Sequence, residues 1–252
     1  MSSQLLKAPP LARAEWMLSL YPQAGEAGGC FIPTRRAPRP ATWGPALDPD
    51  RARVEAARRA RGKVRRYCAA NRLNRLGTLT YRGEGCHDPG QLRADVGEFF
   101  RQLRAELGGK PLAYLWVAEW HKTGHGQHVH FAVGRYVRRG LIEAAWGRGF
   151  VHIKLLGNLP VGAGPLAEAR RAASYLSKYV AKSFDAERVP GLHRYEVAQG
   201  FQPHKLRLSG VTDHQVVGLA SAQLGAPPEH IWRSSQMADW TGPPAVWASW
   251  AG

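Results

Sequence analysis

The stretch that decides the fold is residues 113–134, AYLWVAEWHKTGHGQHVHFAVG. Residues 113–120 and 127–134 are rich in aromatic and β-branched side chains, and the loop between them contains glycine. This pattern predicts two antiparallel strands joined as a hairpin. Because successive side chains of a strand point to opposite faces of the sheet, His128 and His130 are expected on one face of this hairpin.

The sequence on either side of the hairpin predicts a larger sheet. Residues 76–81 (LGTLTY) and 150–156 (FVHIKLL) favour strands. Apolar residues recur at helical spacing over residues 92–107, and a short helix is expected over 138–146. The order β-α-β-β-α-β is that of an α+β, ferredoxin-like or RRM-like domain, in which helices cover one face of an antiparallel sheet. We expect the other face to be free for a substrate.

The rest of the chain divides by composition. Residues 1–50 are rich in Pro, Gly and Arg and are expected to form an extended arm, followed by a basic helix over 51–70. A compact domain is expected over 71–208, and its last helix covers 166–184. Residues 209–252 contain several tryptophans among Gly and Pro and are expected to form an irregular tail.

The charge of the chain points to a polyanionic partner. Thirty-five Lys and Arg stand against nineteen Asp and Glu, a formal net charge of +16. Such an excess attracts nucleic acid through its phosphates. In the basic helix it is concentrated in one run, and the alternative there is a charged helix that only meets solvent. The residues expected to contact DNA are Arg58, Arg59, Arg61, Lys63, Arg65 and Arg66.

Several function classes are disfavoured by what the sequence lacks. No run of about 18 apolar residues occurs and the first residues have no signal-peptide pattern, so we expect a cytoplasmic protein without a membrane partner. No G-x-x-x-x-G-K-[ST] phosphate loop is present, so a host helicase and polymerase would have to supply unwinding and synthesis. The three cysteines are widely separated, which indicates neither a disulfide framework nor a zinc knuckle.

A metal site is the first candidate for chemistry. His128 and His130 form a bidentate pair, and Glu119 on the preceding strand can reach the same face. His121 is the alternative third ligand. Two imidazoles and a carboxylate leave positions open for phosphate oxygens, and Mg²⁺ or Mn²⁺ suits that chemistry better than zinc. Among the remaining histidines, His152 is the one whose strand is expected to border this site.

The second candidate is the segment YLSKYVAK on the last predicted helix. At 100° per residue, Tyr175, Lys178, Tyr179 and Lys182 lie within an arc of roughly 100° on one side of the helix. A phenol is a poor nucleophile until positive charge favours the phenolate, and the two lysines are expected to supply that charge. The alternative is that these tyrosines and lysines serve only packing and solvation.

Taken in order, the strand LGTLTY, the His128-Val129-His130 pair and YLSKYVAK resemble the three motifs of HUH endonucleases, in particular rolling-circle replication initiators of plasmids and bacteriophages. The resemblance covers less than half of the chain. It implies a nicking domain over residues 71–208 that cuts single-stranded or melted origin DNA with a divalent metal. It also implies a 5′-phosphotyrosine, a 3′-OH primer and later rejoining of the strands.

The resemblance bears on individual residues too. An acidic side chain on the strand before the histidines often completes the metal site of that family, which favours Glu119. Two-tyrosine members use one tyrosine to start the cycle and the other to resolve the displaced strand. Some relatives have glutamate at the position of Tyr175, so Tyr179 is favoured as the initiating nucleophile.

Other functions fit the same motifs. A conjugative relaxase or a single-strand transposase of the same superfamily would use the same chemistry, although relaxases commonly carry the tyrosine near the amino terminus. A protein that only binds DNA or controls copy number, without catalysis, would need no more than a basic surface and aromatic side chains. A covalent protein–DNA adduct would distinguish it from a nicking enzyme.

Overall fold

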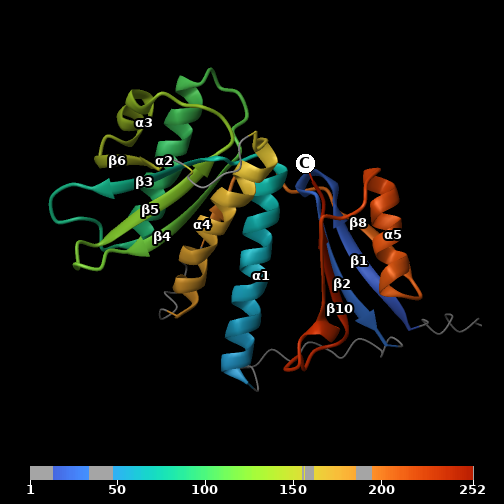
Figure 1. The fold of residues 1–252 in the computed structure, drawn as a ribbon. Coiled ribbons are helices and arrows are strands. Elements are labelled where there is room, and N and C mark those ends of the chain that lie inside the picture. Colours follow the sequence, from blue (N-terminus) through green and yellow to red (C-terminus); the bar gives the residue numbers. More distant parts are fainter. Residues whose placement is uncertain (1–13, 34–47, 155, 157–161, 186–194, 252) are drawn as a thin grey trace, which may run out of the picture. The chain divides into compact units, whose positions relative to one another are not determined.

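The computed structural model describes residues 14–33, 48–154, 156, 162–185 and 195–251 (Figure 1). Contacts within the chain divide it into two compact units. One unit spans residues 1–45 and 204–251, and the other spans residues 46–203. The Pro/Arg-rich stretch predicted as an arm lies mostly in residues 34–47, outside the described residues.

The larger unit contains the predicted β-α-β-β-α-β order. Its central elements are β3 (Arg75–Tyr81), α2 (Pro89–Glu106), β4 (Tyr114–Trp120), β5 (Gln127–Val133), α3 (Arg139–Trp146) and β6 (Gly149–Lys154). The flanking elements are α1 (Pro49–Ala70), α4 (Pro165–Asp185) and the short β7 (Glu196–Val197). The sheet order is β6-β3-β5-β4-β7, and each neighbouring pair is antiparallel. The predicted α+β, RRM-like fold class is therefore confirmed.

One face of this sheet is closed by α2 and α3. Apolar residues of α2 recur at helical spacing and pack on the inward side chains of the strands, among them Phe99 against Phe131. Gly77 on β3 is required for this contact, because a Cβ atom there would lie 2.4 Å from the Phe131 ring. The result is a dry core that fixes the direction of every side chain on the opposite face of the sheet.

The opposite face was expected to be free, and here the prediction needs correction. Helices α1 and α4 contact each other (Figure 1), and α4 contacts β4 and β5. Together they form a second core with the sheet, including Leu115 and Ala132. The physical reason lies in α1: between its basic residues, Ala60, Val64 and Cys68 recur every four positions and are buried. The charged helix therefore has an apolar stripe that needs a partner.

The smaller unit replaces the predicted arm and tail with a folded sheet. Its elements are β1 (Glu15–Tyr21), β2 (Glu26–Ile32), β8 (Leu206–Gly210), α5 (Asp213–Leu224), β9 (His230–Arg233) and β10 (Ala245–Ser249), with 3-10 turns at Pro22–Ala24 and Ser234–Gln236. The sheet order is β8-β1-β2-β10-β9, so strands from both ends of the chain interleave. Apolar side chains of α5 and the sheet, including Leu18, Val216 and Trp250, form its core. Neither segment is irregular as the sequence analysis expected.

Across the described residues, none of the helices combines the length and apolar character needed to cross a membrane.

Candidate active site

The β4–β5 hairpin aligns three side chains that could bind a metal. Glu119 pairs directly with His128 across the two strands, and His130 follows two residues later on the same face. The turn is tight because Gly124 and Gly126 adopt positive φ angles of 79° and 69°, a conformation that glycine adopts without steric penalty. The sequence analysis predicted this hairpin and its register through the alternation of side chains.

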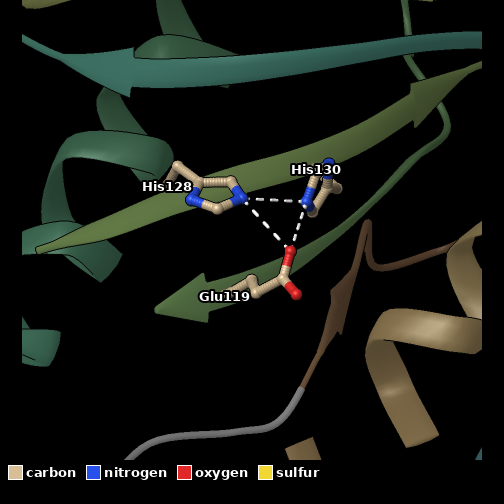
Figure 2. Close-up of side chains that lie close together, drawn as sticks. All are labelled: Glu119, His128 and His130. Carbon is tan, nitrogen blue, oxygen red and sulfur yellow. Dashed lines mark hydrogen bonds and ion pairs between the residues drawn. The ribbon is translucent and has the colours of Figure 1, made fainter. Parts of the chain in front are cut away.

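The three side chains converge on one point (Figure 2). The Nε2 atoms of His128 and His130 are 3.0 Å apart, and Oε2 of Glu119 lies 3.2 Å from the first and 3.0 Å from the second. Metal–ligand bonds of about 2.1 Å at right angles would separate neighbouring donor atoms by about 3.0 Å. The triad therefore fits one triangular face of an octahedral ion, with the remaining positions open.

The histidine rings are held from behind. Oγ1 of Thr78, on the neighbouring strand β3, lies 3.1 Å from Nδ1 of His130. Such a contact to the second ring nitrogen fixes the tautomer and orientation of an imidazole ligand. Nδ1 of His128 is buried and has no hydrogen-bond partner among the described residues. Both Nε2 atoms are thus directed at Glu119.

Burial sets the protonation of the triad. Desolvation lowers the pKa of His130 to about 4 and lowers that of His128, although the carboxylate of Glu119 opposes both shifts. Burial alone would raise the pKa of Glu119, but hydrogen bonds from Lys182 and His130 outweigh it and lower that pKa. At neutral pH the site therefore offers neutral imidazole and an ionised carboxylate, the forms that coordinate metals.

Helix α4 brings both tyrosines to the triad. The Tyr179 ring stacks on the His130 ring, with centroids 3.7 Å apart and planes 21° from parallel. The Tyr179 hydroxyl donates a hydrogen bond of 2.6 Å to the Tyr175 hydroxyl. Tyr175 also meets His130, edge to face, at 6.2 Å between ring centroids. The two phenol oxygens thus form one hydrogen-bonded pair next to the candidate metal ligands.

The phenolate is not favoured by the protein alone, contrary to what the sequence suggested for the lysines. Burial raises the pKa of Tyr179, and its hydrogen bond to Tyr175 and the charge of Glu119 raise it further. Nζ of Lys182 forms a 2.8 Å ion pair with Oε1 of Glu119 and lies 5.1 Å from the centre of the Tyr179 ring. Its charge is therefore largely matched by Glu119.

The other lysines of the site have different positions. Lys178 is exposed, and the described residues show no contact between it and the triad or the tyrosine rings. Lys154 at the end of β6, which the sequence analysis did not single out, lies with Nζ 4.7 Å from the centre of the Tyr175 ring. Its only signal in the sequence was its place two residues after His152 on a predicted edge strand.

His121, the alternative third ligand, lies beside the triad but outside it. Its Nδ1 atom is 2.7 Å from Oγ1 of Thr123 in the hairpin loop, and its ring centroid is 5.5 Å from that of His128. The group of donor atoms close enough to share an ion contains Glu119, not His121, among the described residues. This geometry favours Glu119 as the third ligand.

The residues predicted to contact DNA lie on α1. Arg58, Arg59, Arg61 and Lys63 are exposed, whereas Arg65 and Arg66 are half-buried. Arg58 forms an exposed ion pair of 2.9 Å with Glu55 one turn earlier. Exposed pairs of this kind contribute little to stability and are easily replaced by a phosphate contact. The DNA role of this helix stays a prediction.

The fold and the site together define the class of protein. An α+β sheet presents a Glu-His-His group to a helix with two adjacent tyrosines. Residues 74–184, from the start of β3 almost to the end of α4, match the family described as replication-associated protein ORF2. Comparison with curated proteins and with solved structures gives no significant match. The family match supports a Rep-type replication initiator, and with it a role in DNA replication and interaction with DNA.

Proposed function

We propose that this protein is an HUH-type replication initiator, which nicks single-stranded or melted origin DNA and holds the new 5′ end as a phosphotyrosine. The observation that carries this proposal is the stacking of Tyr179 on His130, which brings a phenol to the edge of the candidate metal triad. The family match over residues 74–184 supports the replication role.

His128, His130 and Glu119 are the residues that would hold Mg²⁺ or Mn²⁺. Their donor atoms have the separations of octahedral ligands, and oxygen-rich open positions suit a phosphate substrate. When bound, the divalent ion polarises the scissile phosphodiester and offsets the negative charge that raises the pKa of Tyr179. Lys182 keeps the Glu119 carboxylate in place through its ion pair.

In the nicking step, Oη of Tyr179 attacks the scissile phosphorus and forms a new P–O bond. The bond between that phosphorus and the 3′ oxygen of the preceding nucleotide breaks, and this oxygen takes up a proton to become the 3′-OH primer. The proton of Tyr179 passes to solvent. The Tyr175 hydroxyl then reverses its hydrogen bond and donates to the Tyr179 phenolate, which stabilises the attacking form.

Rejoining is the reverse of the same step. A phosphodiester is exchanged for a phosphotyrosine of similar type, so a 3′-OH can attack the adduct without ATP. Tyr175 is the candidate second nucleophile because it shares the hydrogen bond and the ring contact with His130. Lys178 faces solvent and would act on the displaced strand through its charge. The basic residues of α1 would hold DNA, while helicase and polymerase come from the host.

The test is a denaturing gel after incubation of labelled single-stranded origin DNA with the protein and Mn²⁺. Wild type is compared with Tyr175→Phe, Tyr179→Phe, the double variant, and the control Tyr136→Phe, which changes an exposed tyrosine outside the site. We expect a denaturant-resistant adduct that requires metal, persists in the control and disappears in the double variant.

Other outcomes would redirect the proposal. Tight binding without any adduct would favour a non-enzymatic DNA-binding or copy-control protein. Cleavage without an adduct would indicate a metal-activated water as the nucleophile. An adduct formed with transfer-origin or transposon-end DNA, but not with a replication origin, would indicate a relaxase or a single-strand transposase.

A further inference from the structure

The edge strand β6 carries a row of side chains that belongs to the face of the candidate site. In the register of the sheet, Phe150 pairs with Thr80, which in turn pairs with His128. One row further on, His152 pairs with Thr78, which pairs with His130. Directly paired residues of antiparallel strands point to the same face, so β6 extends the face that contains the triad.

Phe150 is unusual on this strand because its side chain is 69% exposed. The residues on either side of His152, Val151 and Ile153, point the other way and pack against the core under α2 and α3. The strand is therefore fixed, while its outer face presents an aromatic ring, an exposed imidazole and Lys154. Lys154 lies over the Tyr175 ring, which connects this row to the tyrosine helix.

We propose that Phe150 is a positioning residue that stacks on a base of single-stranded DNA next to the scissile phosphate. This inference rests on the proposed nicking function and names the part of the substrate that the edge strand recognises. A ring face is the chemistry that binds any base without reading its hydrogen-bonding edge. His152 and Lys154 add polar and cationic groups for the adjoining backbone.

The dimensions of the sheet suit this role. β6 is separated from β5 by one strand, so Phe150 lies about 10 Å from His128 across the sheet. A phosphate at the triad and the base of a neighbouring nucleotide on Phe150 can therefore belong to the same short stretch of DNA. Stacking there would hold the scissile phosphate against the tyrosines, because the base cannot slide past a fixed strand.

The experiment measures binding and adduct formation separately on the full chain. Binding is followed by fluorescence anisotropy with a labelled oligodeoxythymidylate of about 16 nucleotides, in about 0.15 M salt and across a salt series. The variants are Phe150→Ala, Phe150→Leu and Phe150→Trp. The control is Tyr136→Ala, which removes an exposed ring (73% exposed) from the same unit but outside β6.

We expect Phe150→Ala and Phe150→Leu to weaken binding by about 5- to 100-fold. Phe150→Trp and the control should bind like wild type. The slope of affinity against salt should not change in any variant, because no phosphate contact is removed. Adduct formation by Phe150→Ala should slow at low DNA concentration and recover at high concentration.

Two results would overturn the inference. If Phe150→Leu binds like wild type, an apolar contact rather than stacking is made at this position. If Phe150→Ala binds and reacts like wild type, the ring does not hold DNA, and an accompanying change of oligomeric state would make β6 an edge for a second copy of the chain. Failure of the proposed function is distinguishable, because then wild type itself forms no adduct even though the binding comparison can still be read.

Discussion

Replacing Thr78 by Val tests how the candidate metal site is held. Thr78 Oγ1 lies 3.1 Å from Nδ1 of His130, so when Nε2 faces a metal the Nδ1 proton is donated to this hydroxyl. Valine keeps the shape of threonine and removes the acceptor. A buried polar group left without a partner costs about 1–3 kcal/mol. Loss of such a supporting contact weakens metal binding about 10- to 100-fold, or about 1.4–2.7 kcal/mol, so the two estimates agree.

The assay is calorimetric titration of Mn²⁺ into wild type, Thr78→Val and Thr80→Val. Thr80 is the matched control because it lies on the same strand and face, and pairs with His128 without a hydrogen bond to that imidazole among the described contacts. We expect a 10- to 100-fold weaker Kd for Thr78→Val and an unchanged Kd for the control. Equal affinity in all three proteins, or equal weakening in both variants, would refute the reasoning.

Three further changes test other parts of the structure. Asp95→Ala should lower the unfolding free energy by about 2–4 kcal/mol in chemical denaturation, because Asp95 is buried and accepts a 2.9 Å hydrogen bond from Tyr81 that would be lost. Gly126→Ala should cost more than the matched Gly124→Ala, whose added Cβ meets open space, because a Cβ at Gly126 would lie 2.4 Å from a backbone oxygen; each carries about 1–2 kcal/mol for positive φ. Burial opposes ionisation of Asp213, but a hydrogen-bonded arginine lowers its pKa, so its stabilisation should be present at neutral pH and fade below about pH 4, as melting curves of wild type and Asp213→Asn against pH would show. Equal melting of wild type and Asp95→Ala, equal loss in both glycine variants, or a constant difference across pH would contradict these expectations.

The larger unit could be predicted because its signals are local. The hairpin has alternating side chains and glycines at the turn, and α2 has apolar residues at helical spacing. The contacts of α1 could not be read in the same way, because arginines and lysines surround Val64 and Cys68 and conceal the buried stripe. A basic composition predicts exposure, whereas only tertiary packing shows which side of a charged helix is dry.

The smaller unit escaped prediction for a different reason. Its sheet pairs Leu18 with Leu208, and Gly29 with Val246, so the partners lie near opposite ends of the sequence. Each strand is short, and glycines in β2 interrupt the alternation of apolar and polar side chains. Strand pairing at such separation leaves no local pattern, and Pro- and Gly-rich neighbours favour a loop.

The candidate site was predictable in its composition but not in its charge balance. His128 and His130 share a face because strands alternate, and the hairpin register adds Glu119. The ion pair between Lys182 and Glu119 depends on how α4 crosses the sheet, which helix periodicity does not determine. The expected support of the phenolate by lysine therefore became a contact with the carboxylate.

The most direct measurement of the central claim is the position of the nucleotide on the protein. Trypsin cleaves after Arg171, Lys178 and Lys182, so it separates the two tyrosines into the peptides AASYLSK and YVAK. After reaction with single-stranded origin DNA and Mn²⁺, nuclease trimming and mass spectrometry should find a nucleotide attached to YVAK, which contains Tyr179, and its loss in Tyr179→Phe. A nucleotide on neither peptide, while the DNA is cut, would contradict tyrosine attack.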